Sequence, residues 1–337
     1  MTSSFACVAI GGTKCSVSLA TCEDEAVQWR DRREVATHDG GVEMVAELSI
    51  LLTEMLGAAP DTTLVRIGVV CGGPLDEDRG LVLNPPNLPG WVDFDVVTPL
   101  ATRFKVAVRL MNDASASALA EWAWGSARGA RNCVFLTMGT GMGAGLIIGG
   151  RLHRGASGFA GEIGHWRLAP EGPWGFGKYG SFEGFCSGGG IAGWASARAR
   201  EAHAAGWATL MSRNEDDRGN ITARSAATAA LAGDPLAREL WSDVGHRLGT
   251  ALALLVDLLN PDVIAIGGIF PRQEKLIRPH MEMALLREAL APSLASCAIV
   301  PAELDELIAD YAALAVALVG ESFDPLARRI SAAVAHD

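Results

Sequence analysis

Two short glycine–threonine turns, each between a pair of apolar runs, constrain this chain more than any other feature of its sequence. The first, Gly11-Gly12-Thr13-Lys14, separates the apolar runs 5–10 and 15–21. The second, Gly139-Thr140-Gly141-Met142-Gly143, separates the runs 133–138 and 144–148. Apolar runs split by a glycine-rich turn are typical of β-hairpins. A similar hairpin opening each half of the chain predicts a duplicated α/β architecture with a central cleft between two lobes.

Each turn has two possible roles. Backbone N–H groups in a glycine turn can point together at an anion because no Cβ blocks the approach, and a threonine hydroxyl adds a donor. Alternatively, each is an ordinary hairpin turn. Neither has the GxxxxGK[ST] pattern that defines a P-loop. The presence of two such turns, one in each half, favours anion binding.

Apolar residues at helical spacing alternate with short apolar runs along the rest of the chain. This alternation is typical of α/β proteins, and 337 residues are enough for two domains. Helices are predicted over 42–56, 114–125, 191–205, 223–231 and 235–259, and strands over 64–71, 106–111 and 263–266. Segment 84–91 contains three prolines and is predicted to be a loop.

The charge balance and the cysteines narrow the class of protein. The chain has 28 basic and 39 acidic residues, a net charge of −11, and no cluster of Lys and Arg that would bind a phosphate backbone. Its longest apolar run, 251–256, is far short of a membrane span, and its first residues lack a signal peptide's basic region. Seven cysteines without a CxxC pair argue against a disulfide framework. We expect a cytoplasmic protein that binds neither nucleic acid nor membranes.

Several polar residues are candidates for chemistry. Asn112 and Asp113 lie between a predicted strand and a predicted helix, where either side chain can cap the helix or Asp113 can act as a general base in a cleft. Glu162, His165 and Glu183 are either solvated side chains or ligands of a polyol, whose recognition requires several paired hydroxyls. Spacing along the chain does not show whether these residues converge.

These motifs resemble those of sugar kinases of the ROK family, within the actin/hexokinase-like superfamily. The most specific stretch is 138–165, where the second glycine turn is followed by GEIGH. The resemblance also covers IGGTK at 10–14, CGGPLD at 71–76, PPNLPGW at 85–91, Asn112-Asp113 and NPDVIAIGG at 260–268. It implies a two-lobe, ribonuclease H-like duplicated fold, with a small lobe of 1–113 plus 318–337 and a large lobe of 114–317.

The resemblance also implies roles for individual residues. Asp113 would deprotonate the sugar hydroxyl that attacks the γ-phosphate of ATP. The sugar hydroxyls would be held by Asn87, Asn112, Glu162, His165 and Glu183. The nucleotide would be bound by Gly11, Gly12, Thr13 and Lys14, by Gly139, Thr140 and Gly141, and by Gly267 and Gly268.

The reaction implied is the transfer of phosphate from ATP, with Mg²⁺, to the 6-hydroxyl of a hexose, in a homodimeric enzyme. Glucose is the first expectation, and N-acetylmannosamine, N-acetylglucosamine, fructose and allose are the alternatives. Phosphoryl donors other than ATP, such as polyphosphate, also remain open.

Two departures from the family pattern affect these expectations. Many members have the loop CxCGxxGCxE, whose cysteines hold a structural zinc together with the GExGH histidine. Here those cysteines are replaced by Trp174, Phe176 and Ser181, so we expect no zinc. We expect the loop to be anchored by burial of Trp174 and Phe176, with Phe182 as a further candidate anchor.

The second departure is Ala9, which stands where family kinases usually have an aspartate that orients Mg²⁺. Loss of that carboxylate would lower turnover unless water and the nucleotide phosphates complete the metal's coordination. The alternative function is therefore a sugar-binding regulatory protein with weakened or no catalysis.

Overall fold

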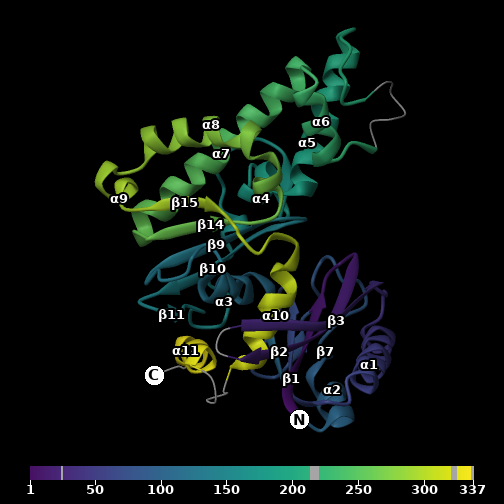
Figure 1. Ribbon diagram of the computed structural model, residues 1–337. Helices are drawn as coiled ribbons and strands as arrows, with labels where there is room; N and C mark the ends of the chain where they lie inside the picture. Colours follow the sequence, from purple (N-terminus) through teal and green to yellow (C-terminus); the bar gives the residue numbers. More distant parts are fainter. Residues whose placement is uncertain (24–25, 213–219, 320–324, 335–337) are drawn as a thin grey trace. The chain divides into compact units, whose positions relative to one another are not determined.

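The computed structural model describes residues 1–23, 26–212, 220–319 and 325–334 (Figure 1). The chain divides into two compact units: the first comprises Met1–Phe135, Gly145–Ala160 and Glu303–Asp337, and the second Leu136–Ala144 and Gly161–Ala302. Helices and strands are mixed in the chain, as the sequence predicts. The lobes expected from the sequence have different bounds from these units, and the lobe boundaries stay a prediction.

The sheet of the first unit contains the first predicted hairpin. Its strand order is β3-β2-β1-β4-β8, and β1 is antiparallel to β2 and parallel to β4, which is parallel to β8. The turn between β1 and β2 starts directly after Ile10, so the hairpin prediction is confirmed. The strands are β1 (Thr2–Ile10), β2 (Lys14–Glu23), β3 (Ala26–Ala36), β4 (Thr62–Cys71) and β8 (Ala107–Asn112).

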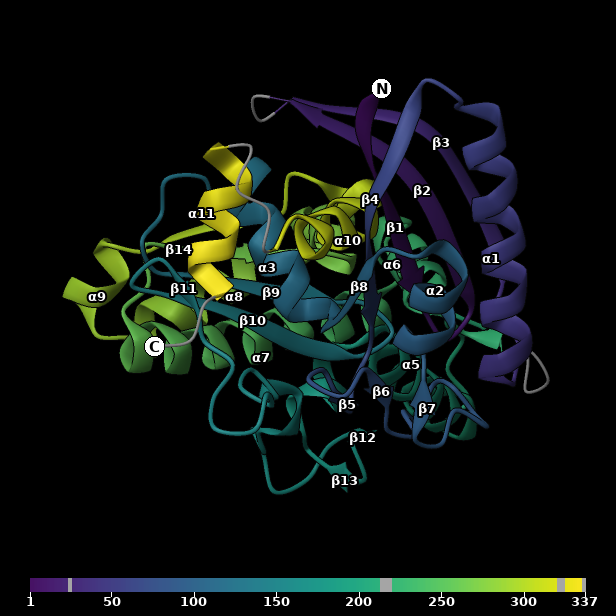
Figure 2. The same cartoon turned by 90° about the horizontal axis from the view of Figure 1, so that it is seen from below.

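Helices cover both faces of this sheet. On one face α1 (Gly41–Ala58) buries Met44, Leu48 and Leu52 against Val8 and other strand residues, and Figure 2 shows this helix running along the strands. On the other face α10 (Ile308–Leu318) packs on β1 and β4. It approaches closely because Gly68 has no side chain: a Cβ there would lie 2.0 Å from the carbonyl oxygen of Ala313.

Shorter elements complete the first unit. They are β5 (Leu75–Asp76), β6 (Leu81–Val82) and β7 (Phe94–Asp95), which form a small sheet, together with α2 (Val97–Phe104), α3 (Asp113–Trp124), the 3₁₀ turn Asp305–Leu307 and α11 (Pro325–Val334). Helix α3 follows β8 without a loop and packs against α10, so the β8–α3 junction is fixed on two sides.

A second sheet has the strand order β11-β10-β9-β14-β15. Its strands are β9 (Cys133–Met138), β10 (Met142–Ile148), β11 (Arg151–Leu152), β14 (Val263–Ile266) and β15 (Ala298–Pro301), and the boundaries of the two units fall within β9 and β10. The glycine turn at 139–141 joins β9 to β10, as the sequence predicts for the second hairpin.

Most of the second unit is helical. Its elements are the 3₁₀ turn η1 (Ile163–His165), the hairpin strands β12 (Trp174–Gly175) and β13 (Lys178–Tyr179), and α4 (Phe182–Cys186), α5 (Gly188–Ala204), α6 (Ala223–Leu231), α7 (Pro235–Leu259), α8 (Ile269–Glu288) and α9 (Ala291–Ala295). Gly245 and Gly249 let α7 pack closely on α8, because a Cβ at either would lie within 2.6 Å of an α8 carbonyl oxygen. Among the described helices, none is long and apolar enough to cross a membrane.

Candidate functional site

The first glycine turn is fixed from two directions. The Thr37 hydroxyl donates to the Gly11 carbonyl at 2.6 Å, and the Thr37 N–H donates to the Thr13 carbonyl at 3.1 Å. Gly12 lies against the proline-rich loop, since a Cβ at Gly12 would be 2.7 Å from both the Cβ and the carbonyl oxygen of Asn87. The structure thus brings a predicted phosphate turn and a predicted sugar ligand into contact within the first unit.

The β8–α3 junction separates the two roles considered for Asn112 and Asp113. Asn112 caps the helix, because its Oδ1 accepts hydrogen bonds from the N–H groups of Ala114 and Ser115 at 3.0 and 3.1 Å. Asp113 Oδ1 accepts a hydrogen bond of 2.8 Å from the Ala114 N–H. Its other carboxylate oxygen, Oδ2, lies near Gly72: a Cβ on that glycine would be 3.8 Å from Oδ2.

The environment of Asp113 suits a proton acceptor. The residue is exposed to solvent, but it lies among many protein atoms, and this desolvation raises the pKa of Asp113 above its ordinary value. The hydrogen bond from Ala114 opposes the shift. A raised pKa makes the ionised carboxylate a stronger base than an ordinary surface aspartate.

The second glycine turn lies in the second unit and contacts the start of α5. The Gly139 N–H donates to the Gly141 carbonyl at 3.1 Å, and the Gly188 N–H donates to the Gly139 carbonyl at 2.7 Å. Gly268, with φ +73°, passes so close to β9 that a Cβ would lie 2.2 Å from the Met138 carbonyl oxygen. The predicted nucleotide residues at 139–141 and 267–268 are therefore neighbours.

A pocket of about 320 Å³ opens beside this turn. It is lined by Gly139, Thr140, Gly188, Gly189, Ala192, Thr222, Ala223, Arg224 and Ile269. The N-termini of α5 and α6 both meet it, and unpaired N–H groups and the helix dipoles at such ends favour anions. The helices predicted over 191–205 and 223–231 correspond to α5 and α6, but the residues at their starts were not among the predicted site residues, although the N-cap residues Ser187 and Thr222 are typical of helix starts.

Glu183 connects the α4 segment to the second glycine turn. Its Oε2 accepts a hydrogen bond of 3.1 Å from the Met142 N–H, and a Cβ on Gly141 would lie 2.8 Å from the same oxygen. Burial raises the pKa of Glu183, and the hydrogen bond from Met142 opposes the shift. A predicted sugar ligand is therefore adjacent to a predicted phosphate turn.

Glu162 precedes the 3₁₀ turn η1, His165 is its last residue, and both are exposed. The rings of His165 and Phe176 lie with centroids 3.5 Å apart, and Lys178 Nζ donates to the His165 carbonyl at 2.6 Å. Desolvation, with a smaller contribution from the Lys178 charge, lowers the pKa of His165. The imidazole is therefore neutral at neutral pH, so one of its ring nitrogens can donate a hydrogen bond and the other can accept one.

The loop that replaces the cysteine motif is a short hairpin, β12–β13. The Ser181 hydroxyl accepts from the Gly184 N–H at 3.0 Å and caps α4, while Phe176 is half-buried and packs on His165. The expected burial of Trp174 is wrong: its exposed fraction is 58%, because its ring packs edge-on against Tyr179, which is also exposed. The buried anchor is Phe182, which is fully buried and stacks on Trp166.

Within the described part of the chain, no group of three His, Cys, Asp or Glu side chains could hold a metal ion.

The residues near Asp113 are compatible with a weakly held Mg²⁺. Ala9 lies opposite Ser16 on β2 and Val70 on β4. The next residues toward the ends of β1, β4 and β8 are Ile10, Cys71 and Asn112, which lie side by side. Ala9 thus contributes a methyl group, and the buried Ser16 a hydroxyl on the same face, where a carboxylate is usual in the family. Mg²⁺ keeps several waters and needs only one or two protein carboxylates beside substrate phosphates, so a metal carried mainly by the nucleotide does not require a carboxylate at position 9.

The predicted site residues are divided into two sets by the units of the chain. One lies in the first unit and contains Gly11 to Lys14, Asn87, Asn112 and Asp113. The other lies in the second unit and contains Gly139 to Gly141, Glu162, His165, Glu183, Gly267 and Gly268. Each set combines residues of a glycine turn with polar side chains.

The fold is the two-lobe α/β fold of actin/hexokinase-like sugar kinases. It is shared by a ROK family glucokinase from Streptomyces griseus solved in complex with glucose and AMPPNP, with a TM-score of 0.75 and 26% identity over 93% of this chain and 99% of that chain. The ROK family model matches residues 5–317, so the chain belongs to the ROK family.

Named relatives of this chain include sugar kinases. A glucokinase from Halalkalibacterium halodurans is 33% identical over 279 residues, which are 81% of this chain and 82% of that protein. An N-acetylmannosamine kinase from Shigella boydii is 32% identical over 263 residues, 77% of this chain and 80% of that protein. These identities establish the family and leave the choice of sugar open.

Proposed function

We propose that the protein is an ATP-dependent sugar kinase that phosphorylates the 6-hydroxyl of a hexose, with glucose as the first candidate. The observation that carries this proposal is Asp113, which starts α3 at the end of β8 with one oxygen bound to the helix and a raised pKa. The family membership, the glucokinase relative and the pocket beside the second glycine turn support it.

In this proposal the ionised Asp113 accepts the proton of the sugar 6-hydroxyl as the hydroxyl oxygen attacks the γ-phosphorus of ATP. The new bond joins that oxygen to phosphorus, and the bond from phosphorus to the β,γ-bridging oxygen breaks, which releases ADP. A nucleotide-bound Mg²⁺ would neutralise charge on the phosphates. Asn87, Asn112, Glu162, His165 and Glu183 would orient the sugar hydroxyls.

The nucleotide would occupy both glycine turns and the pocket of the second unit. Thr140, Gly189 and the first turn of α6 line this pocket and would meet the phosphates, while Gly267 and Gly268 would border the adenosine. Gly11 to Lys14 would bind the phosphates from the first unit. The Lys14 ammonium already pairs with Glu34 at 2.9 Å and remains largely exposed.

We further infer a cytoplasmic homodimer. None of the seven cysteines forms a disulfide, as is usual in a reducing compartment. Large apolar side chains are exposed on α7 and α8, among them Leu254, Leu258, Met283 and Leu286, and exposed apolar patches are typical of subunit contacts.

A second candidate function is a sugar-binding regulator without catalysis, and Ala9 is the observation that favours it. Calorimetry would then show sugar binding while Mg²⁺–ATP gives only background ADP. Ala9→Asp should raise turnover if the missing carboxylate limits the reaction; no gain would count against this explanation of Ala9.

The test is ADP release with Mg²⁺–ATP across hexoses and N-acetylhexosamines, in the wild type and in Asp113→Asn. The replacement is nearly isosteric and removes the base, so a sugar-dependent signal should fall by about 100-fold or more. Retention of the signal in Asp113→Asn would refute the assigned base. Silence of the folded wild type with every sugar, and with polyphosphate as donor, would refute the kinase.

A further inference from the structure

A carboxylate outside the predicted site residues contacts the segment that carries Asp113. Glu77 follows β5 directly, and its Oε1 accepts a hydrogen bond of 2.8 Å from the backbone N–H of Asn112. Strand β8 is at the edge of its sheet, where backbone groups need partners other than a further strand. Glu77 therefore supplies the acceptor at the last residue of β8.

The other oxygen of Glu77 pairs with an arginine from a distant segment of the same unit. Arg154 Nη2 lies 2.7 Å from Glu77 Oε2, and the two side chains are only 15% and 9% exposed. Arg154 follows β11, in the glycine-rich stretch that precedes GEIGH. Burial raises the pKa of Glu77, whereas the Asn112 N–H and the charge of Arg154 oppose this shift and favour the ionised acceptor.

We propose that Glu77, held by Arg154, is a positioning residue that fixes the β8–α3 junction and thereby the direction in which Asp113 presents its carboxylate. The inference rests on the proposed function, in which Asp113 is the base. Glu77 acts through the backbone: it holds the N–H of Asn112, whose side chain caps α3 and whose neighbour is Asp113. The causes that shift the pKa of Asp113 are desolvation and local backbone hydrogen bonds, so the Glu77 charge is not what tunes the base.

The kinetic test compares Glu77→Ala, Glu77→Gln and a matched control. Glu77→Ala removes the acceptor and should lower kcat by about 10- to 100-fold through misplacement of the base, with the KM for ATP within about twofold. Glu77→Gln keeps an acceptor for Asn112 but loses the ion pair, so it should recover part of kcat. In both variants the acid limb of the pH profile should stay where it is, because Asp113 remains the base.

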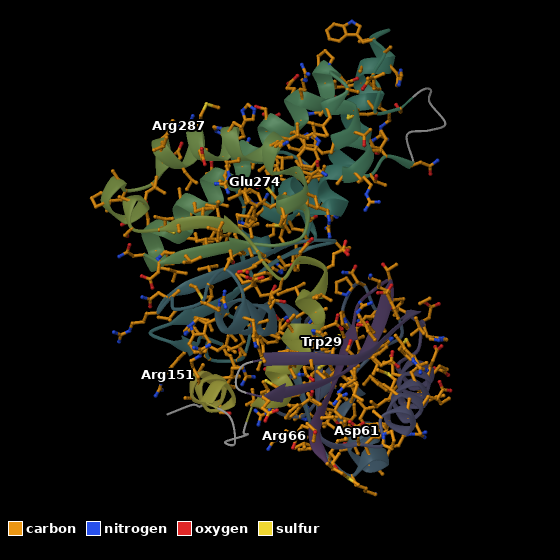
Figure 3. All side chains as sticks on the ribbon, in the orientation of Figure 1. Trp29, Asp61, Arg66, Arg151, Glu274 and Arg287 are labelled. Carbon is orange, nitrogen blue, oxygen red and sulfur yellow. The ribbon has the colours of Figure 1, made fainter. Side chains whose placement is uncertain are left out.

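The control is Glu274→Ala, which removes a carboxylate–arginine contact of similar length, 2.6 Å to Arg278. Glu274 is on α8 in the second unit and is labelled in Figure 3. This variant should retain the kinetics of the wild type. A Glu77→Ala enzyme with unchanged kcat, or one in which only KM rises, would overturn the proposal.

A second readout does not depend on activity. Amide hydrogen exchange at Asn112 should be slow in the wild type and in Glu274→Ala, and faster by about tenfold or more in Glu77→Ala, because that N–H loses its acceptor. Unchanged exchange at Asn112 would refute the anchoring itself. If the wild type phosphorylates no sugar, the kinase proposal fails, but exchange still decides whether Glu77 holds this junction. Should Glu77→Ala not fold, Glu77→Gln and Arg154→Met carry both measurements.

Discussion

Asp113 combines a helix-start hydrogen bond with a desolvated carboxyl, and this combination determines how the rate should depend on pH. Its pKa is raised, so the protonated, inactive form persists to higher pH than in an ordinary aspartate. We predict that kcat/KM falls as the pH decreases through this raised value, with an acid limb of unit slope. A pH series with the free enzyme at low sugar concentration measures it.

The same series with Asp113→Glu provides a control, because a carboxylate is kept in a changed environment and the limb should move. An acid limb at the position of a normal surface carboxylate would contradict the assignment of Asp113 as the desolvated base.

Gly12 should be sensitive to a single methyl group. In Gly12→Ala the new Cβ would meet the Asn87 carbonyl oxygen at 2.7 Å, and backbone cannot move aside as cheaply as a flexible side chain. We predict a loss of about tenfold or more in kcat/KM, because the turn and Asn87 are pushed apart. Steady-state kinetics with both substrates measures it.

Gly57→Ala is the matched control for this glycine, since a Cβ there would meet nothing within 4 Å and Gly57 lies in α1. That variant should keep full activity and gain a few tenths of a kcal/mol to about 1 kcal/mol in stability. Equal effects of the two replacements would argue that Gly12 is not a tight contact.

At the scale of single residues, the sequence indicates which side chains are candidates for the site but not which partners they contact. The motif Asn112-Asp113 left the cap and the base undecided, and the structure assigns the cap to Asn112 because its Oδ1 reaches two N–H groups. Glu77 and Arg154 were not singled out, because their contact joins positions 77 apart in the chain and no periodic pattern records it. The assignment of site residues to sugar and nucleotide stays a prediction.

At the scale of an element, the β12–β13 hairpin raises the question of what stabilises a loop that lacks the zinc cysteines. Its contacts are packing and hydrogen bonds: Phe176 on His165, Lys178 on the His165 carbonyl, and the Ser181 cap. We predict that a zinc chelator leaves the melting temperature unchanged. It should also leave the activity unchanged, provided that the chelator does not remove the Mg²⁺ of the assay. Thermal unfolding with 1,10-phenanthroline, which binds Mg²⁺ weakly, checks this.

The complementary change is Phe176→Ala, which removes the ring from His165 and should destabilise the protein by about 1–3 kcal/mol. Phe176 also has φ +53°, a conformation that costs a non-glycine residue energy, so the ring contact must outweigh that cost. A chelator-induced drop in melting temperature larger than that caused by Phe176→Ala would show that a metal holds the loop.

The elements themselves were largely readable from the sequence. The two hairpin turns, the proline-rich loop and the long helix α7 agree with their apolar patterns and breakers. The pattern did not show that Trp174 would be exposed, because aromatic residues next to glycine can either anchor a loop or cover it from outside. Nor did it show the pocket, which forms only when two helix N-termini from separate segments meet.

At the scale of the whole molecule, the thiols offer a probe of integrity. Six of the seven cysteines are buried, and Cys297, the exception, has its pKa raised to about 11 by burial and by the nearby charge of Asp262. Because the thiolate is the reactive form, we predict that the native protein reacts slowly with a disulfide reagent, first at Cys297, and that all seven thiols react after denaturation.

Thiol titration at pH 8 with and without denaturant measures this, and Cys297→Ser should abolish the slow native reaction. Rapid reaction of two or more thiols in the native protein would mean that the cores of the two units open readily.

Helix α10 occupies a position in the chain that matters during synthesis. It covers the face of the first sheet by packing on β1 and β4, and its buried Asp310 accepts hydrogen bonds from Ser18 and Arg32. A ribosome that adds about 5–20 residues per second completes β4 some tens of seconds at most before it reaches α10. Throughout that interval the nascent sheet has one apolar face uncovered, together with the gap at Gly68 that only this helix fills. The emerging chain therefore exposes an apolar surface of the kind that chaperones bind until α10 has been synthesised.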